Sequence, residues 1–506
     1  MSSLRSHSAS ASVRPRHLIV LALVAVALAA TAANALAARV NIVRQGPPPV
    51  GKIPRNTAYF TTIQAAVNDA TTGDWVLIEP GVYDEEVKVE PAHSGIWIRG
   101  MNRNTVVLDG KHESCKHSPC PEGSNGIEIN KASNVYVENL SVANFDRATL
   151  DGSGGNEIWW NGGAGSKKIG ASGWYGRYLT AYDTGFNGGY GIFTNNETKG
   201  WWEKIYASGF NDSGMYLGAC QECKARISEA VMEDNALGYS GSNSGGKLVI
   251  EKSTFRNNTD GIAPNSENPG DGPPPQDGEC HRENIEAPNP TPEVKSTKVK
   301  RCTVFRDNLI TENANLTVPA NSSAAAAPWG TGVELPGVYA DLLEGNTITN
   351  NPTNGVLGFE YPNPFPPTES TLYFQLAGNK ISANTFSGNG SAGGAFAGDV
   401  MLTGGLFGTQ TSTNNCLSAN TFADATYPAK IEEAWGCQHK TTPNPDTAYA
   451  EPFQAIEYLL ELQYVSEHRE EILNAKGMKV EGQPAPPPQE TMPEPCKEVP
   501  KNPLCP

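Results

Sequence analysis

Basic residues are scarce in this chain of 506 residues, where 38 Lys and Arg stand against 54 Asp and Glu and the formal net charge is −16. A protein that binds nucleic acid contacts the phosphates through Lys and Arg, so we expect no nucleic acid partner. The same charge disfavours general attraction to polyanions. An acidic polymer would therefore need a local basic site or a metal ion.

Long apolar runs are missing after residue 38, which predicts no membrane span in the mature chain. Before that point, three Arg precede an apolar run over Leu18–Leu28 and an Ala-x-Ala sequence at Ala35–Ala37. This order is typical of a secretory signal peptide, which we assign to residues 1–38. The alternative is an uncleaved anchor, because the run could reach across a bilayer with its Ala-rich tail. The placed Ala-x-Ala site favours cleavage and a secreted, extracellular protein.

All ten Cys follow the signal peptide, and an even count in an exported chain predicts disulfides. Neighbours in sequence give the expected pairs Cys115–Cys120, Cys220–Cys223, Cys280–Cys302, Cys416–Cys437 and Cys496–Cys505. The motif His112-x-x-Cys115-x-His117-x-x-Cys120 also has the residue types of a metal site. An oxidising compartment favours the disulfide, so we expect no metal site.

The first folded segment combines one helix with several short strands. Residues 62–69 predict a helix with Thr61 or Thr62 as its N-cap, and Gly73-Asp74 ends it. The strands expected next are Trp75–Ile78, Val87–Val89, Gly95–Gly100 and Thr105–Gly110. Strands this short cannot bury a face alone, which indicates a stacked repeat.

A repeat follows in the middle of the chain. Gly-apolar pairs begin at Gly191, Gly214, Gly238 and Gly261, spaced 23, 24 and 23 residues apart, and resume at Gly332 and Gly355. A second pattern places a small polar residue between two apolar ones, at Ser253, Asn308, Asn346, Asn384 and Asn420. Polar residues that stack at equivalent bends are expected to form hydrogen-bonded ladders between coils. Both patterns predict an all-β, right-handed parallel β-helix with a short N-terminal capping helix and a C-terminal helix.

The segments outside the repeat complete the organisation. We expect a linker over 39–58, the β-helix over 59–440 with a long loop at 264–300, a helical segment over 441–481 and a Pro-rich extended tail over 482–506. Five apolar residues predict the buried face of the helix, which we expect to cover the open C-terminal end of the solenoid: Phe453, Ile456, Leu459, Leu460 and Val465.

The candidate substrate-binding stretch runs from Glu157 to Trp202 and holds five of the nine Trp. Rings beside polar groups suit stacking on sugars, although they could equally pack as core. Neighbours on a strand face opposite ways, so one of each adjacent Trp pair is expected outside. The residues proposed for substrate binding are Glu157, Trp159, Trp160, Trp174, Tyr175, Arg177, Trp201 and Trp202.

Catalytic candidates are fewer. Asp183 and Asp212 lie near turns of successive coils, as do Asp234 and Asp260, and stacked carboxylates could reach the spacing used in glycoside hydrolysis. Their offsets from the repeat Gly differ, which favours turn-forming Asp. Arg226 is a further candidate, because alternation points it outward and some β-helix lyases use Arg as a base.

The first coil and the repeat resemble right-handed β-helix proteins of the pectin-lyase-like fold over roughly residues 60 to 425. Four local runs are similar to exported actinobacterial members of unassigned activity: residues 156–163, 216–223, 237–241 and 273–278. The characterised relatives include pectate lyases, polygalacturonases and alginate epimerases. Their signatures, Asn-Thr-Asp with Gly-His-Gly and Asp-Pro-His-Asp, are missing here, so the resemblance carries over no catalytic residue.

Three functions follow from these observations. The first is a secreted β-helix that binds extracellular or cell-surface polysaccharide through the aromatic stretch. The alternative is a polysaccharide lyase or glycoside hydrolase that acts on a uronic-acid polymer, with Ca²⁺ as a cofactor only if it is a lyase. A metal-delivery β-helix is disfavoured, because no His-rich or Met-rich track is present.

Overall fold

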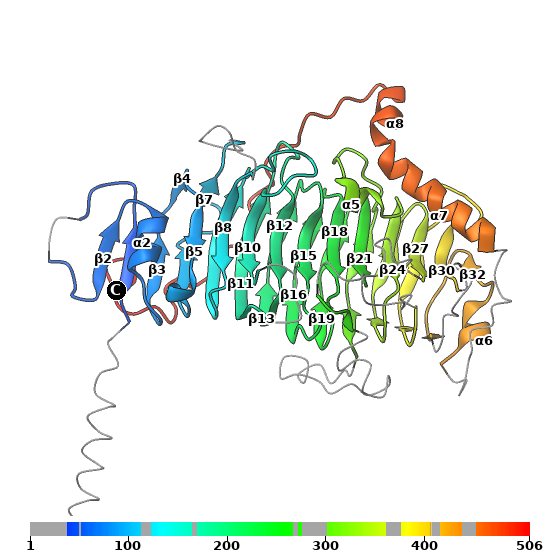
Figure 1. The fold of residues 1–506 in the computed structure, drawn as a ribbon, viewed down its shortest axis with the longest axis horizontal. Coiled ribbons are helices and arrows are strands. Elements are labelled where there is room, and N and C mark those ends of the chain that lie inside the picture. Colours follow the sequence, from blue (N-terminus) through cyan, green and yellow to red (C-terminus); the bar gives the residue numbers. More distant parts are fainter. Residues whose placement is uncertain are drawn as a thin grey trace, which may run out of the picture.

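The computed structural model describes residues 38–49, 52–112, 123–163, 169–266, 272–275, 301–360, 376–404, 406, 415–437 and 452–506. Its strands form two parallel sheets that stack coil upon coil into a long solenoid (Figure 1). This is the right-handed parallel β-helix that the repeat predicts. The segment predicted to be a signal peptide, except Ala38, and most of the loop predicted at 264–300 lie outside the described residues.

The larger sheet has 21 strands in the described residues. They are β1 Val40–Val43, β2 Thr57–Phe60, β3 Trp75–Ile78, β4 Gly81–Tyr83, β6 Trp97–Gly100, β7 Val106–Asp109, β9 Val135–Ala143, β11 Ala171–Tyr182, β13 Glu197–Glu203, β14 Tyr206–Ser208, β16 Ala225–Ser228, β17 Val231–Glu233, β19 Leu248–Glu251, β20 Thr254–Arg256, β22 Thr303–Arg306, β23 Leu309–Thr311, β25 Leu342–Glu344, β26 Thr347–Thr349, β28 Lys380–Ser382, β29 Thr385–Ser387 and β31 Cys416–Ser418.

The smaller sheet has 11 strands in the same described ranges. They are β5 Val87–Val89, β8 Asn125–Asn130, β10 Asn156–Asn161, β12 Tyr190–Asn195, β15 Ser213–Gly218, β18 Leu237–Ser242, β21 Asp260–Asn265, β24 Thr331–Pro336, β27 Asn354–Phe359, β30 Gly398–Leu402 and β32 Thr426–Tyr427. A typical coil runs from one strand of the small sheet through two short strands of the large sheet, as β15, β16 and β17 do before β18 begins the next coil.

The glycine repeat marks one inward position of the small sheet. Gly238 and Gly261 hold that position in β18 and β21, and a Cβ on either would lie 2.5 or 2.4 Å from the carbonyl oxygen of the next coil's glycine. Real Cβ contacts are not this short, so only glycine lets consecutive coils stack here. The residue after each glycine, such as Tyr239 and Ile262, points into the apolar core.

The predicted polar ladder is confirmed. Asn308, Asn346, Asn384 and Asn420 lie at the bend between the two large-sheet strands of successive coils, and each amide Nδ2 donates to the next Oδ1 at 2.9–3.0 Å. The buried backbone at the bend would otherwise leave polar groups unpaired. A second ladder, Asn258–Asn313–Asn351–Asn389, does the same at the turn that leads into the small sheet.

Helix α2, Ile63–Asp69, covers the N-terminal end of the core with Ile63, Ala66 and Val67. Thr62 is its N-cap and accepts a hydrogen bond from the Ala65 amide at 3.3 Å. The segment 39–58, which the sequence predicts to be a linker, contains strand β1. The side chains of Val40, Ile42 and Val43 in this strand are buried. The remaining short helices are η1 Pro91–His93, α5 Ser322–Ala325 and α6 Ile431–Trp435.

The expectation that the C-terminal helix covers the open end is wrong. Helix α7, Pro452–Glu467, and helix α8, Arg469–Ala475, run along the side of the last coils (Figure 1). Ala455, Tyr458 and Leu462 are the buried apolar residues of α7, and they pack on the outer face of the small sheet. Phe453 and Leu460, both predicted to be buried, are 82% and 58% exposed. It is α6 that places Ile431 and Trp435 in the core at the open end.

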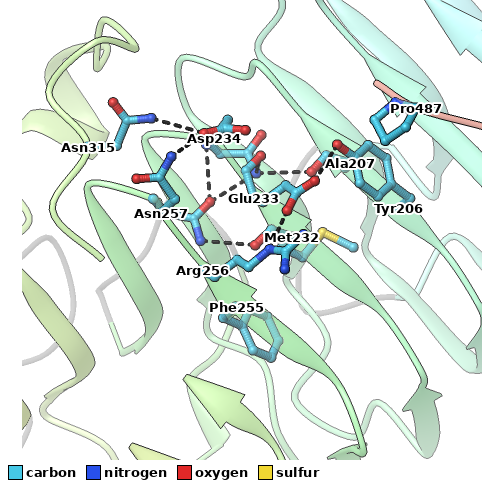
Figure 2. Close-up of polar contacts among 12 residues, drawn as sticks. Tyr206, Ala207, Met232, Glu233, Asp234, Phe255, Arg256, Asn257, Asn315 and Pro487 are labelled. Atoms are coloured by element: carbon cyan, nitrogen blue, oxygen red, sulfur yellow. Dashed lines mark hydrogen bonds and ion pairs between the residues drawn. The ribbon is translucent and has the colours of Figure 1, made fainter. Parts of the chain in front are cut away.

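Residues 482–506, which we name the C-terminal strap, return along the outer face of the large sheet to the N-terminal end (Figure 1). Side chains of β6 and of the loop after it hold the strap: Arg99 donates to the carbonyl oxygens of Pro495 and Lys497 at 2.9 Å, and Asn104 exchanges two 2.8 Å bonds with Gln489. Figure 2 shows Pro487 of the strap beside Tyr206. The strap therefore covers the first coils on this face.

Three of the five predicted disulfides are present: Cys220–Cys223, Cys416–Cys437 and Cys496–Cys505. Cys302 is disulfide-bonded, but Cys280, Cys115 and Cys120 lie outside the described residues. No helix in the described ranges is both long and apolar enough to cross a membrane.

A third polar ladder joins Asn415 to Asn379 and ends at Asp341, where an acid takes the place of an amide. We predict that Asp341→Asn stabilises the protein above neutral pH. Burial raises the pKa of this carboxyl to about 7, whereas an unfolded Asp has a pKa of about 3.9. The fold thus favours the protonated acid, and this stabilisation is present at low pH and is lost as the pH rises from about 4 to about 7. An Asn would instead continue the amides of Asn379 and Asn415.

Urea unfolding at about pH 5 and about pH 8 checks this prediction. We expect the variant to exceed the wild type at the higher pH and the difference to shrink at the lower pH. Asp307→Asn, on a half-exposed side chain, is the matched control. A wild type as stable as Asp341→Asn at the higher pH would contradict the prediction.

Candidate functional site

The aromatic stretch is divided between the core and two outer faces. Trp160, Trp174 and Trp202 are fully buried in the core, where their rings tilt against one another. Trp159 and Trp201 are half-buried and face outward, which confirms that one of each adjacent pair lies outside. However, Trp159 belongs to the small sheet and Trp201 to the large sheet, so the stretch does not form one platform.

On the large sheet, the outward rings stack on one another. Trp75, Trp97, Tyr136, Tyr175 and Trp201 occupy the same position in successive coils, with ring centroids 4.4–5.6 Å apart. Sugar stacking needs a free ring face, and this ladder uses the faces of its inner members for its own contacts. The ladder therefore stabilises the solenoid and leaves mainly ring edges to solvent.

The two Arg candidates on this sheet are held by carboxylates. Arg177 Nε lies 2.7 Å from Glu138 Oε1, and Arg226 forms an ion pair with Glu251, which also binds Arg306. A guanidinium held by a carboxylate keeps its proton, so it is a poor general base. Neither Arg on the large sheet is therefore a candidate for the base of a lyase reaction.

A group of titratable residues gathers instead where the large sheet turns into the small one. His112 lies beyond β7, Asp146 beyond β9 and Asp183 directly after β11, so three coils bring them together. His112 Nδ1 is 3.1 Å from Asp146 Oδ1 and 3.9 Å from Asp183 Oδ1. We name these three residues and Glu157 the turn cluster.

The glycines after Asp183 explain how the groups come so close. A Cβ at Gly185 would lie 2.9 Å from His112 Cε1, and one at Gly188 would lie 2.8 Å from Asp183 Oδ2. Gly185 also donates its backbone N–H to Asp183 Oδ1 at 2.6 Å. Glycine at these positions leaves room for the imidazole and the carboxylate to meet.

Hydrogen bonds fix the tautomer of His112. Thr184 Oγ1 donates to Asn144 Oδ1 at 3.0 Å, and Asn144 Nδ2 donates to Asp109, which sets the amide orientation. His112 Nε2 lies 2.8 Å from the same Thr184 oxygen and must donate to it. Nδ1 therefore faces Asp146 and Asp183. The chain Thr184–His112–Asp146 has the order of a nucleophile triad, but the Thr184 proton points away from the ring.

Glu157 stands where other coils carry the repeat glycine, because Asn156 and Ile158 pair with Tyr190 and Ile192 on either side of Gly191. Its side chain consequently points inward, is fully buried, and accepts a hydrogen bond from the Phe145 amide at 3.2 Å. Burial raises the pKa of Glu157 well above its ordinary range, and the nearby Asp183 raises it further.

The pKa values of Asp146 and Asp183 are raised as well. Burial raises the pKa of Asp183 to about 7, with the charge of Asp146 as the second cause, and burial raises the pKa of Asp146 as well. Asp183 is fully buried, whereas the His112 side chain is 35% exposed. Solvent therefore reaches the cluster through His112, and strongly perturbed acids in such a place are typical of reaction centres.

A patch on the outer face of the small sheet adjoins the cluster. Arg147, next to Asp146, lies over the Tyr190 ring at 5.2 Å and 3.6 Å from Asp212 Oδ2. Tyr190 in turn contacts Phe193, which stacks on Trp159 at 5.1 Å. Asp212 is buried and accepts from Asn321 at 2.6 Å, so it positions Arg147 and is not itself open to a substrate.

The other acids that the sequence suggests lie apart from this centre. Asp234 has positive φ and accepts hydrogen bonds from Asn257 and Asn315, as expected of a turn-forming Asp (Figure 2). Beside it, Glu233 accepts from Tyr206 at 2.7 Å and pairs with Arg256. Asp260 is fully buried near Glu334.

The structure brings together residues that could serve as metal ligands, although the sequence predicts no metal site. One ligand atom each from His112, Asp146 and Asp183 lie within 4.8 Å of one another, which is a set that could hold a metal ion. Ca²⁺ takes six to eight oxygen ligands, and this set supplies two carboxylates and one nitrogen, so Ca²⁺ fits it poorly. Sequence reasoning missed Asp146 and used His112 only in the Cys motif, because the coil between them has no regular spacing.

Comparisons with known proteins support the fold and do not identify a reaction. No protein-family model matches the chain, and no curated protein matches it. Among solved structures, the A-module of a mannuronan C-5 epimerase of Azotobacter vinelandii is 13% identical, with 71% of this chain and 90% of that chain covered and a TM-score of 0.40. A mannuronic acid specific polysaccharide family 6 lyase from human gut microbiota is 12% identical, with 70% and 78% covered and a TM-score of 0.39.

The catalytic unit of an α-1,3-glucanase of Streptomyces thermodiastaticus is 13% identical, with 71% of this chain and 52% of that chain covered and a TM-score of 0.32. These neighbours differ in the reaction that they perform. They assign no reaction to this chain.

The adjacent Trp pairs give a test of the placement described above. We predict that Trp202→Ala lowers the free energy of unfolding by about 3–5 kcal/mol, because it opens a cavity in the core. Trp201→Ala removes a half-exposed ring and should cost less than about 2 kcal/mol. Denaturant unfolding of the two variants measures the difference, and equal losses would show that the inward and outward assignments are mistaken.

Proposed function

We propose that this chain is a secreted enzyme that cleaves a uronic-acid polysaccharide, with the turn cluster as its reaction centre. The observation that carries the proposal is the burial of three neighbouring carboxyl groups beside His112, whose side chain is the exposed member of the cluster among the described residues. Buried acids that share a site destabilise a fold, so their presence calls for a functional reason.

The geometry favours β-elimination over hydrolysis. A glycosidase places two carboxyl groups on either side of the bond that it breaks, about 5–10 Å apart. Here Asp146 and Asp183 both lie within 4 Å of one imidazole nitrogen, which leaves no room for a sugar between them. A lyase needs one proton acceptor and a group that stabilises the uronate carboxylate on one face of the sugar. A cluster reached from one side suits that requirement.

The adjoining patch supports a polymeric substrate. Arg147 is buried and paired with Asp212, so it places a positive charge against the Tyr190 ring without being open itself, and Phe193 and Trp159 continue from Tyr190 across the small sheet. Polar groups alternate with these rings, as in the 2.7 Å bond from Trp159 Nε1 to Asn195. An acidic sugar chain laid across the coils would meet these groups in series.

Export completes the proposal. The signal-like sequence at residues 1–38 and the disulfides of the described chain are what a protein that folds outside the cytoplasm requires. A secreted polysaccharide lyase would act where its polymer is found. A β-helix that only binds polysaccharide remains the alternative, and the same experiment separates the two.

The purified mature protein is tested against plant, algal and bacterial polysaccharides, with absorbance of unsaturated uronate ends and new reducing ends as the two readouts. We predict unsaturated product from an acidic polymer and a loss of at least about 100-fold in His112→Ala, since the variant removes the exposed member of the turn cluster on which proton abstraction at this site depends. His93→Ala, on another coil, is the control and should keep the wild-type rate.

Reducing ends without unsaturation would replace the lyase with a hydrolase. Retention on a polysaccharide gel without any product would leave the binding function. Full activity in His112→Ala would remove the turn cluster from the reaction.

A further inference from the structure

We propose that His112 Nδ1, Asp146 and Asp183 bind a divalent transition metal ion such as Zn²⁺ or Mn²⁺. The inference names a cofactor for the reaction centre of the proposed function. Only the role of the ion in the reaction rests on that function. The binding itself follows from the atoms described below.

The three ligand atoms are already gathered around one point. They lie within 4.8 Å of one another, with Nδ1 3.1 Å from Asp146 Oδ1 and 3.9 Å from Asp183 Oδ1. The point equidistant from the three corners of such a triangle lies roughly 2.0–2.4 Å from each of them. Zn²⁺ binds imidazole nitrogen and carboxylate oxygen at about 2.0–2.2 Å, so small side-chain shifts complete the site.

The tautomer of His112 points the correct nitrogen at the site. Because Thr184 gives its proton to Asn144, its oxygen accepts the N–H of His112 Nε2. The neutral ring then carries its lone pair on Nδ1, directed at two carboxylates. Without an ion, a proton on Nδ1 would donate to Asp146 Oδ1, 3.1 Å away, and a bound cation would take the place of that proton. Histidines that bind metals usually donate their other N–H to such a fixed acceptor.

The surrounding charge also calls for a cation. Asp183 is fully buried, and its Oδ2 accepts no hydrogen bond in the described part of the chain. The same holds for Oε2 of Glu157, which lies behind it. Arg147, the nearby guanidinium, is turned toward Asp212. A buried carboxylate with an unused oxygen is a costly group unless a proton or a metal ion occupies it.

The donor set selects the class of metal. One imidazole and two carboxylates suit Zn²⁺ or Mn²⁺, whereas Ca²⁺ requires more oxygen ligands than these residues supply. The competing state without metal is an imidazolium whose Nδ1–H donates to Asp146. That state predicts no stoichiometric metal binding, which makes the two distinguishable.

The test is calorimetric titration of the chelator-treated mature protein, without an affinity tag, with ZnCl₂, MnCl₂ and CaCl₂ and with no polysaccharide present. We expect one equivalent of Zn²⁺ or Mn²⁺ to bind, and Ca²⁺ to bind at least about 10-fold more weakly. His112→Ala and Asp183→Asn should abolish this binding, and His93→Ala should leave it unchanged. Thr184→Val, which keeps all three metal ligands and removes the hydroxyl that contacts Nε2 and Asn144, should weaken it about 10–100-fold.

Circular dichroism checks that each variant is folded, and Thr184→Val keeps the test decisive if the ligand variants do not fold. Absence of a stoichiometric Zn²⁺ or Mn²⁺ site in the wild type, or binding unaffected by both His112→Ala and Thr184→Val, would overturn the inference. Cleavage of a polymer by the chelated protein at the full rate would overturn the role of the ion as cofactor and leave the proposed function standing. Tight binding with no product from any polymer would support the inference and count against the proposed function.

Discussion

The register between successive coils is the constraint on which the rest of this structure depends. Every strand pairs in parallel with the equivalent strand of the next coil, so each residue stacks on a residue of the same position. A position that suits one coil must therefore suit all of them. Glycine fills the inward position where no Cβ fits between Gly238 and Gly261, and Asn fills the bends where amides can bond in series.

Departures from this register mark the candidate site. Glu157 replaces the glycine of its column with a buried acid, and the turns after β9 and β11 place Asp146 and Asp183 side by side. Stacking brings like residues together, which for carboxylates is unfavourable. Protons shared within the group, or a metal ion, are the available ways to relieve that repulsion. The stacking of equivalent positions, which stabilises the Asn amides at the bends, thus also brings the acids of the turn cluster together.

The C-terminal strap and helix α7 each cover part of the outer surface of the solenoid. The C-terminal strap occupies the outer face of the large sheet over the first coils, and its Gln483 donates to the carbonyl oxygen of Thr184 at 2.9 Å. Helix α7 occupies the small sheet over the last coils through Tyr458 and Leu462. Between these two covers lies the stretch of small sheet that carries Trp159 and Tyr190 beside the turn cluster.

Sequence reasoning succeeds where a pattern repeats. The glycine column and the Asn ladder each repeat in several coils, so a chance match in one coil does not change the fold that they predict. The inward or outward side of Trp201 and Trp202 follows from strand alternation alone. The turn cluster could not be found this way, because it joins three coils through loops of unequal length, and only the folded register shows that His112, Asp146 and Asp183 meet. Helix α7 was misjudged for a related reason: its moderate periodicity does not say which surface of the solenoid it contacts.

A structure of the mature protein with a bound oligouronate, determined with the His112→Ala variant to prevent turnover, tests the central claim most directly. The account predicts that the sugar chain lies across the outer face of the small sheet, past Trp159 and Tyr190, with one uronate at the turn beside Asp146 and Arg147. A chain bound instead along the large sheet, over Tyr175 and Trp201, would contradict the account and return the function to the aromatic ladder.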